Sequence, residues 1–250
     1  ELAKATLNVS GGSNVVVNTA GEVDDRTVGR LELAGGVIDF GEMTEGSEKG
    51  QIEIGGLTFN GNYGLTTLRV ALEDITGLAA DVAGSSVFDH NSGFSVQLIE
   101  GVDLTNWSMN IFNFSESFEE VQQVTQSGRH ADGSATAELT YSNGHLVGNT
   151  DGISASWTLS KIDLLSGNGS GFLIDASAET GDSGTISALI TGEGSIEFAG
   201  GTITLNHANN TYTGNTYVTD GELVLAADEA LGDSALLKVT GSGTVSVGST

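Results

Sequence analysis

Cysteine, proline and basic residues are the residue types that this sequence lacks or nearly lacks. Its 250 residues include no cysteine, no proline and only 8 lysine and arginine residues, against 33 aspartate and glutamate residues. Without cysteine there can be no disulfide scaffold, no cysteine nucleophile and no thiolate metal site. The formal charge of −25 at pH 7 would repel phosphate backbones and anionic lipid headgroups, because their binding depends on clustered lysine and arginine. We therefore expect no nucleic-acid partner.

Long apolar runs are lacking as well. No stretch approaches the roughly 18 apolar residues of a membrane-spanning helix, and no basic-then-apolar leader opens the chain, so we expect no direct membrane insertion of this segment. Hydrophobic residues still make up 38% of the chain, which is too many for a disordered acidic tail. The chain opens at Glu1 and stops directly after an alternating stretch, so we expect it to be a fragment of a longer protein.

Short alternating segments run along most of the chain. Apolar and polar residues alternate over 31–33, 51–54, 222–225 and 244–247, a pattern typical of strands with one buried face. Gly-Gly, Asn-Gly and Asp-Gly pairs separate these segments, and such pairs take up tight turns at little conformational cost. The sequence therefore predicts an all-β fold.

Internal repeats favour one all-β architecture. Residues 29–40 and 194–205 share the pattern G-x-h-E-h-A-G-G-x-I-x-h, where h is apolar, and residues 50–59 carry a shorter copy. The first and the shorter copy start 21 residues apart, about one coil of a parallel β-helix, whose coils bury their apolar faces only by stacking. We predict a single-stranded right-handed parallel β-helix, a pectin-lyase-like solenoid. An antiparallel sandwich or barrel is the alternative, because Asn-Gly and Asp-Gly also form hairpins.

The repeat alignment also predicts which side chains point inward and which point outward. Four apolar residues of one coil should lie above four of the next, namely Leu31, Leu33, Ile38 and Phe40 above Ile52, Ile54, Leu57 and Phe59. Glu32 and Glu53 would then point outward, one above the other and about 5 Å apart. Such a carboxylate pair could bind a divalent cation or act on glycans. We favour a solvated face, with Arg30 nearby to offset the repulsion.

The middle of the chain is less regular than its ends. We predict β-helix coils over 1–75, irregular or decorated coils over 76–150, and β-helix coils over 151–250. Ser117 and Glu120 form a capping-box pattern, with Phe118, Val121 and Val124 at helical spacing. The sequence therefore predicts a short helix or a loop decoration over 115–126.

The stretch 194–247 carries a long ordered pattern: Gly200-Gly201-Thr202-Ile203-Thr204-Leu205, Ala208-Asn209, Tyr212-Thr213-Gly214, Thr216, Val218, Gly221, Leu223, Leu225 and Ala230-Leu231-Gly232. With these residues the stretch resembles the passenger-associated repeat, or autotransporter-associated β-strand repeat, of bacterial autotransporters. The stretch departs from the usual form at Asn209-Asn210, where one inserted residue would make the corner bulge. Upstream, residues 157–164 resemble more weakly a segment that often precedes the repeat.

The resemblance implies a passenger of type V secretion, exported through the outer membrane by a C-terminal barrel that is absent here. Such a chain would be displayed at the bacterial cell surface or released, as a β-helical stalk with an adhesive or self-associating surface. Its partners would be a host-surface or matrix component, a glycan or another copy of itself, and its C-terminal coils would help the passenger to fold. The lack of cysteine and proline suits this route, because it avoids oxidative crosslinks and slow isomerisation during export.

Two short motifs invite a catalytic interpretation. Gly181-Asp182-Ser183-Gly184 spells the nucleophile motif of chymotrypsin-like serine proteases, which also need a histidine far upstream. Only His90 lies far enough ahead, and its neighbours do not match that family. Gly232-Asp233-Ser234 repeats the motif inside the passenger-associated stretch, so we predict that both are turns. The glycine-rich residues 166–171 lack the lysine of a phosphate-binding loop and are predicted to form a flexible corner.

Aromatic and histidine residues are the remaining candidates for a site. Trp107, Trp157, Tyr212 and Tyr217 could stack on sugars, but we favour roles in the core or in capping it, and we predict packing for Phe112, Phe114 and Phe118. His90, His130, His145 and His207 lack the spacing of a metal site. We expect no catalytic, metal or cofactor-binding residues, no cofactor and no enzymatic activity. A β-helix enzyme that acts on polysaccharides through clustered carboxylates is the alternative.

Overall fold

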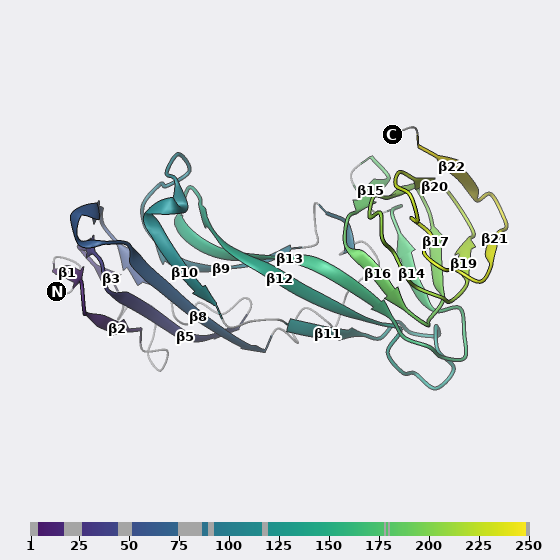
Figure 1. The fold of residues 1–250 in the computed structure, drawn as a ribbon, viewed down its shortest axis with the longest axis horizontal. Helices are drawn as coiled ribbons and strands as arrows, with labels where there is room; N and C mark the ends of the chain where they lie inside the picture. Colours follow the sequence, from purple (N-terminus) through teal and green to yellow (C-terminus); the bar gives the residue numbers. More distant parts are fainter. Residues whose placement is uncertain are drawn as a thin grey trace. The chain divides into compact units, whose positions relative to one another are not determined.

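In the computed structural model the chain is a β-solenoid, in which most strands pair in parallel with a strand of the next coil (Figure 1). The structure describes residues 5–17, 27–44, 52–74, 87–89, 93–116, 120–177, 179 and 181–248. Within these ranges helix is limited to 3-10 turns such as η3 (Gly61–Tyr63) and η6 (Met109–Ile111), which are too short to cross a bilayer. The predicted parallel β-helix is confirmed.

Two compact units make up the chain. Unit 1 comprises Glu1–Ile75, Phe94–Phe118 and Gly144–Trp157, and unit 2 comprises Thr76–Gly93, Glu119–Asn143 and Thr158–Thr250. Two long neighbouring strands, β12 (Ala137–Gly148) and β13 (Gly152–Leu164), contribute residues to both units.

Unit 1 winds through three sheets. Sheet 1A contains β1 (Thr6–Ser10), β4 (Arg30–Ala34) and β7 (Leu57–Phe59). Sheet 1B contains β2 (Asn14–Val16), β5 (Val37–Thr44), β8 (Thr66–Asp74) and β10 (Phe112–Glu116). Sheet 1C contains β3 (Thr27–Val28), β6 (Ile52–Ile54), β9 (Gly93–Glu100) and the first part of β13. Successive strands of the chain therefore move from one sheet to the next, as the predicted coils require.

The predicted stacking of Glu53 on Glu32 is wrong. Leu31 pairs with Leu57 and Leu33 with Phe59, 26 residues later, so β7 and not β6 lies beside β4. Both repeat copies are a strand, a glycine corner and a strand, but residues 29–40 turn from sheet 1A to sheet 1B, whereas residues 50–59 turn from sheet 1C to sheet 1A. The shared pattern marks a corner of the coil without saying which corner it is.

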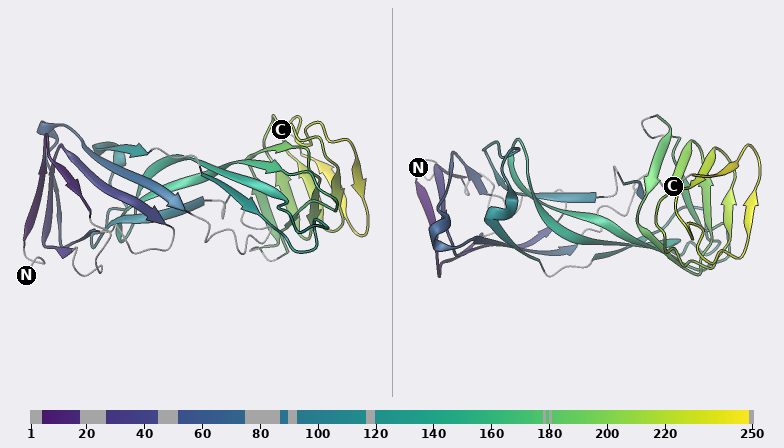
Figure 2. Two further views of the ribbon diagram at one scale, coloured as in Figure 1. Left: turned by 90° about the horizontal axis from the view of Figure 1, so that it is seen from below. Right: turned by 45° about the horizontal axis from the view of Figure 1, so that its top comes forward.

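Unit 2 has shorter and more even coils, which form a stack in Figure 2. Sheet 2A contains β14 (Phe172–Asp175), β17 (Ile196–Ala199), β19 (Thr216–Val218) and β21 (Leu237–Val239). Sheet 2B contains β15 (Ser183–Ile186), β18 (Thr202–Leu205), β20 (Glu222–Leu225) and β22 (Thr244–Val247). On the third side β16 (Leu189–Gly192) pairs with β13, and Thr211 donates its N–H to the Ile190 carbonyl at 2.9 Å. Ile196 pairs with Thr216 and Thr202 with Glu222, each 20 residues later.

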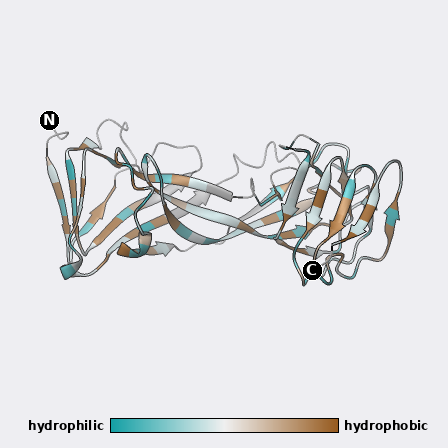
Figure 3. Cartoon of the chain, turned by 90° about the horizontal axis from the view of Figure 1, so that it is seen from above, coloured by the Kyte–Doolittle hydropathy of each residue, from teal (hydrophilic) through white to brown (hydrophobic). Residues whose placement is uncertain are grey.

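Hydrophobic and hydrophilic residues alternate along the strands, as the brown and teal bands of Figure 3 show, and burial follows this alternation. Six of the eight predicted inward residues are buried: Leu31, Leu33, Ile38, Phe40, Ile52 and Ile54; Leu57 and Phe59 are half-buried. The corner glycines Gly35, Gly36, Gly200 and Gly201 all have positive φ, a conformation that L side chains rarely adopt. A Cβ on Gly36 would lie 2.5 Å from the Ser10 carbonyl oxygen, so this corner also needs glycine for space.

The predicted helix over 115–126 is contradicted where the structure describes it. Glu120–Val124 form β11, which pairs antiparallel with β12, with Glu120 opposite Tyr141 and Val124 opposite Ala137. Residues 117–119, which include the Ser117 of the capping-box pattern, lie outside the described residues. Long-range pairing with β12 therefore overrides the local helical spacing, because strand formation depends on the neighbouring strand more than on intrinsic preference.

Val87 and Phe88 close the first coil of unit 2. Both are completely buried, and a Cβ on Gly184 would lie 2.3 Å from the Phe88 ring, so the glycine makes room for that ring. We call Val87 and Phe88 the plug, and Asp89 holds it in place. The Asp89 N–H donates to the Thr185 carbonyl at 2.8 Å, and the Asp89 carboxylate accepts bonds from the N–H and hydroxyl of Ser187. A solenoid coil without a neighbour exposes its core, and Phe88 supplies that neighbour.

A buried asparagine joins three coils at the corner where the sequence predicted an insertion. Asn210 Oδ1 accepts from the Ile190 N–H at 2.8 Å, and its Nδ2 donates to the Ala230 carbonyl at 2.7 Å. Asn210 is 3% exposed, whereas its neighbour Asn209 lies on the surface. The side chain thus satisfies two backbone groups that the corner leaves without strand partners.

Replacing the plug should destabilise unit 2. We expect Phe88→Ala to lower the free energy of unfolding by about 3–5 kcal/mol, because it leaves a cavity beneath Gly184. Leu236→Ala, in the same unit but at a side chain that is 48% exposed, should change it by less than about 1 kcal/mol. Urea unfolding followed by far-UV circular dichroism measures both, and equal effects would contradict the plug.

Asn210→Ala should lower the free energy of unfolding by roughly 2–4 kcal/mol, because a buried backbone donor and a buried backbone acceptor both lose their partner. Asn209→Ala is the matched control, one residue away and exposed, and should stay within about 0.5 kcal/mol of the parent. Thermal and urea unfolding of the two variants test this. The bridging role is wrong if the two asparagines prove interchangeable in their effect.

Candidate functional site

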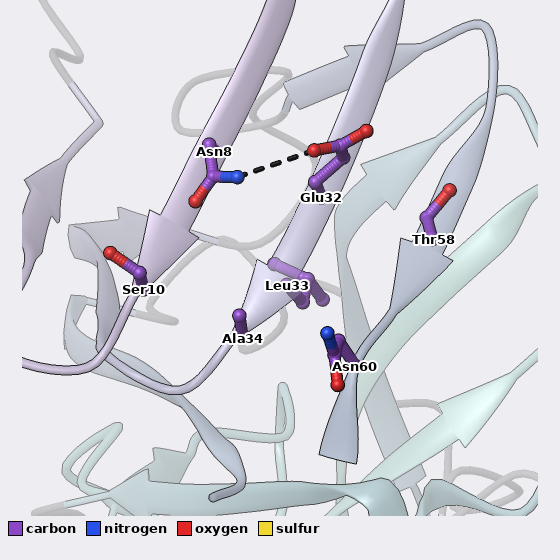
Figure 4. Close-up of a pocket in the computed structure, with 7 residues that line it drawn as sticks. All are labelled: Asn8, Ser10, Glu32, Leu33, Ala34, Thr58 and Asn60. Carbon is purple, nitrogen blue, oxygen red and sulfur yellow. Dashed lines mark hydrogen bonds between the residues drawn. The ribbon is translucent and has the colours of Figure 1, made fainter. Parts of the chain in front are cut away.

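A hollow with both polar and apolar lining residues lies on the outer face of sheet 1A. Its volume is about 350 Å³, and its lining residues are Asn8, Ser10, Glu32, Leu33, Ala34, Thr58 and Asn60. Figure 4 shows these residues on three neighbouring strands and, for Asn60, just after the last of them, with Ala34 between the longer side chains. We call this hollow the sheet 1A trough.

Strand register places the polar groups of the trough. Asn8 is opposite Glu32, and Glu32 is opposite Thr58, so an amide, a carboxylate and a hydroxyl form one outward row across β1, β4 and β7. In the next row Ser10 is opposite Ala34. Because the alanine side chain ends at Cβ, this row is low in the middle, and the hollow results.

Hydrogen bonds orient several of these groups. Asn8 Nδ2 donates to Glu32 Oε2 at 3.2 Å, the bond drawn in Figure 4. Arg30 donates to the Thr58 hydroxyl at 3.3 Å, and Asn60 Oδ1 accepts from the Asn62 N–H at the start of η3. The trough therefore offers carboxylate and amide acceptors with hydroxyl and amide donors, a set suited to binding polar, uncharged molecules.

The same sequence motif has a different environment in unit 2. Glu197 occupies the position of Glu32 in the repeat, but it accepts a 2.6 Å bond from Arg129 and a 3.0 Å bond from the Thr219 hydroxyl. The side chains of Arg129 and Glu197 are only 15% and 16% exposed, and Arg129 also donates to the Gly171 carbonyl. Glu197 is thus held in a structural ion pair.

Glu53 lies on sheet 1C, away from the row that holds Glu32. It accepts a 2.6 Å bond from the Thr27 hydroxyl, and its neighbour in register on the next coil is Glu100. The predicted pair of Glu32 and Glu53 is therefore absent, and the register places Glu53 beside Glu100 instead. Alignment of the repeats missed this pair, because Glu100 lies in a coil with an insertion, 47 residues after Glu53.

The protease-like motif is a turn followed by a strand. Asp182 has a positive φ of 48° and donates its N–H to the Glu179 carbonyl, and Ser183 begins β15. Ser183 shares a shallow depression with Asp89, Thr185 and Thr204, but the Asp89 carboxylate accepts its bonds from Ser187. His90, the predicted partner to test, lies outside the described residues. Gly232 also forms a turn, donating its N–H to Glu229, as predicted.

The four aromatic residues do not form one sugar-stacking surface. Trp157 is 1% exposed and packs edge-on against Phe114 with centroids 6.0 Å apart, and Tyr212 is completely buried. Trp107 is 42% exposed, and Tyr217 is half-buried. Phe112 is buried and contacts Phe59, so the predicted packing role holds for it, whereas Phe118 lies outside the described residues.

His130 and His207 make hydrogen bonds within the chain, and the glycine-rich loop packs against His130. His130 is 3% exposed and its Nδ1 lies 3.0 Å from the Ser134 hydroxyl, and a Cβ on Gly167 would lie 2.5 Å from the His130 ring. The loop over 166–171 therefore packs closely against this histidine. His207 Nδ1 accepts from the Asn209 N–H. In the part of the chain that the structure describes, no group of three or more His, Cys, Asp or Glu side chains could hold a metal ion.

A chain of hydroxyl groups crosses the core of unit 2, which the sequence did not suggest. The Tyr212 hydroxyl lies 2.7 Å from Thr216 Oγ1, which lies 2.8 Å from Ser234 Oγ, and Ser234 donates to the Gly214 carbonyl. Burial raises the pKa of Tyr212 to about 12, and the hydrogen bonds with Thr216 and Ser234 partly oppose this rise. The phenol is therefore a neutral structural group over the physiological range.

The stability of the protein at alkaline pH should depend on the ionisation of Tyr212. Its folded pKa of about 12 lies above the ordinary value near 10, so its contribution to stability is full below pH 10 and is lost as the pH rises to about 12. Over this pH window we expect the free energy of unfolding of the parent to fall by about 3 kcal/mol more than that of Tyr212→Phe. Urea unfolding at a series of pH values measures the difference. Tyr217→Phe is the control, and equal pH slopes for Tyr212→Phe and the parent would contradict the prediction.

Comparison with known proteins adds one relative. No family model matches the chain, and no solved structure matches it. The uncharacterized protein YuaQ of Escherichia coli strain K12 is 26% identical to the chain over 251 residues. The alignment covers 95% of this chain but 18% of YuaQ, so the chain spans about a fifth of the length of the curated relative it matches. The similarity is thus to a segment of a much longer, uncharacterized protein.

Proposed function

We propose that the chain is a passenger segment of an autotransporter, displayed at the bacterial surface as a β-helical stalk with an adhesive or self-associating face. One observation carries the proposal: in the passenger-associated pattern, Ile203 and Leu205 pair in register with Leu223 and Leu225 of the next coil. Gly200-Gly201 form a corner with positive φ, and Leu205, Tyr212 and Leu223 are buried in the core. The pattern thus follows the physical requirements of a stacked coil.

The outer surface of the coils supports a role as scaffold. Polar side chains in unit 2 bond to the coil above or below, as Thr219 does to Glu197 and Ser246 to Glu222. These rows stiffen the stack, and the net charge of −25 keeps it soluble and limits association of partly folded segments during export. The 20-residue coils at the C-terminal end would nucleate folding of the passenger, since stacked coils propagate from a stable end.

The alternative is a polysaccharide-active enzyme with clustered carboxylates. The structure contradicts the carboxylate pair that was predicted for it. Glu32 and Glu53 lie on different sheets and cannot act on one bond. An enzyme of this class would have to use another pair, with Glu53 and Glu100 as register neighbours the first to test. Adhesion remains the proposal because the trough has a single carboxylate and several neutral polar groups.

Surface display and adhesion are tested in one experiment with separate readouts. In bacteria expressing the full-length protein, external protease should remove this segment from intact cells, and the purified chain should reduce autoaggregation or attachment in a dose-dependent way. An unrelated acidic β-solenoid of similar charge is the control. Protection from protease overturns the display. Display without any effect of the purified chain overturns the adhesive face, and new reducing ends from uronic-acid polysaccharides would favour the enzyme.

A further inference from the structure

We propose that the sheet 1A trough is a subsite for one neutral sugar residue of an oligosaccharide. The inference deepens the adhesive part of the proposed function, on which it rests, by naming a partner class and its place on the chain. It stands on the geometry of the three strands β1, β4 and β7 and on the chemistry of their outward side chains.

The shape of the trough fits a single ring. Its volume of about 350 Å³ is at the lower end of the range for small-molecule sites, roughly 300–1,000 Å³. Ala34 forms a small apolar floor between Ser10 on one side and Asn60 on the other (Figure 4). A sugar ring has an apolar C–H face and a rim of hydroxyl groups, so its face can rest on the alanine while its rim meets the polar walls.

The walls supply paired hydrogen-bonding atoms. The Glu32 carboxylate has two acceptor oxygens, of which Oε2 already accepts from Asn8, and the Asn8 amide adds a carbonyl oxygen. Asn60 uses its Oδ1 at the start of η3, which directs its amide NH₂ to other acceptors. Two adjacent sugar hydroxyls can bond such planar groups together, as donors to Glu32 and as acceptors from Asn60.

Charge selects a neutral sugar over an acidic one. The chain carries a net charge of −25, and Glu32 places a negative charge in the trough itself, so uronic acids and sulfated sugars would be repelled. A divalent cation would find only one carboxylate among the lining residues, whereas calcium takes six to eight oxygen ligands. Neutral hydroxyl groups match the site better than either ion.

The repeat offers a matched comparison for this site. Ala199 has the same place in the motif as Ala34, but it follows Glu197, whose carboxylate is already held by Arg129 and Thr219. Filling the two positions with the same larger side chain should therefore affect sugar binding differently. Ala34→Leu fills the trough, and Ala199→Leu adds equal bulk to the outward face of β17, beside a glutamate that is already bonded.

Saturation-transfer NMR with the purified chain tests the proposal directly. The probes are methyl glycosides of glucose, galactose, mannose and N-acetylglucosamine, their short neutral oligomers, and galacturonate as the acidic comparison. We expect saturation transfer to at least one neutral glycan. Ala34→Leu and Glu32→Ala should each raise the Kd for that glycan about tenfold or more, and Ala199→Leu should leave the Kd unchanged. Galacturonate should give no transfer.

Two results would overturn the subsite: no transfer to any neutral glycan, or equal Kd values for the parent, Ala34→Leu and Glu32→Ala. Circular dichroism melts check that each variant is folded, and Glu32→Ala changes an outward side chain, so it serves if Ala34→Leu fails to fold. If adhesion of whole cells persists while sugar binding is absent, only the subsite is wrong. If sugar binding persists while cells neither display the segment nor adhere through it, only the proposed function is wrong.

Discussion

Parallel pairing between successive coils is the interaction on which the rest of this structure depends. A single coil has no partner for its backbone groups or for its apolar face, so every inward side chain and every strand edge must match the coil before and after it. In unit 2 this requirement is met at intervals close to 20 residues. Some polar residues of the core bond to other coils, as Asn210 shows by joining Ile190 to Ala230.

The alternation of side chains and the positions of the corners could be predicted from the sequence, but the identity of each corner could not. Leu31, Leu33, Ile38 and Phe40 were placed inward because period-two spacing and a glycine pair determine them locally. The neighbour of Leu31 depends on the length of the intervening loops, and those loops place Leu57 rather than Ile52 beside it. The short helix failed for the same reason, because the strand that pairs with Glu120–Val124 begins 13 residues later, at Ala137.

One residue of the candidate site could be predicted from the sequence, and its partners could not. Glu32 attracted attention as an outward carboxylate, but Asn8 and Asn60 are isolated asparagines with no motif around them, and only the register of β1, β4 and β7 brings them to the same hollow. The motif around Glu32 recurs at Glu197 with the same letters. What separates the two is Arg129, which lies 68 residues before Glu197 and reaches it through the fold. Sequence similarity between repeats therefore identifies a similar local corner, while its place in the coil and its chemistry depend on its neighbours.

This difference suggests how a repetitive chain divides scaffold from binding surface. On the even coils of unit 2, outward polar groups are satisfied along the stack, with Glu197, Asp220 and Glu222 all bonded to hydroxyls of the following coil. A ligand would have to break those bonds and replace them, which leaves little net gain. In sheet 1A Asn8 bonds to Glu32 and Arg30 to Thr58 across the coils, and the next row, with the small side chain of Ala34 at its centre, lines the hollow. At the same place in the motif Glu197 is held by an arginine and a hydroxyl, whereas Glu32 is bonded by an amide and lines a hollow. The neighbours of the outward carboxylate, and not the alanine beside it, therefore separate the two surfaces.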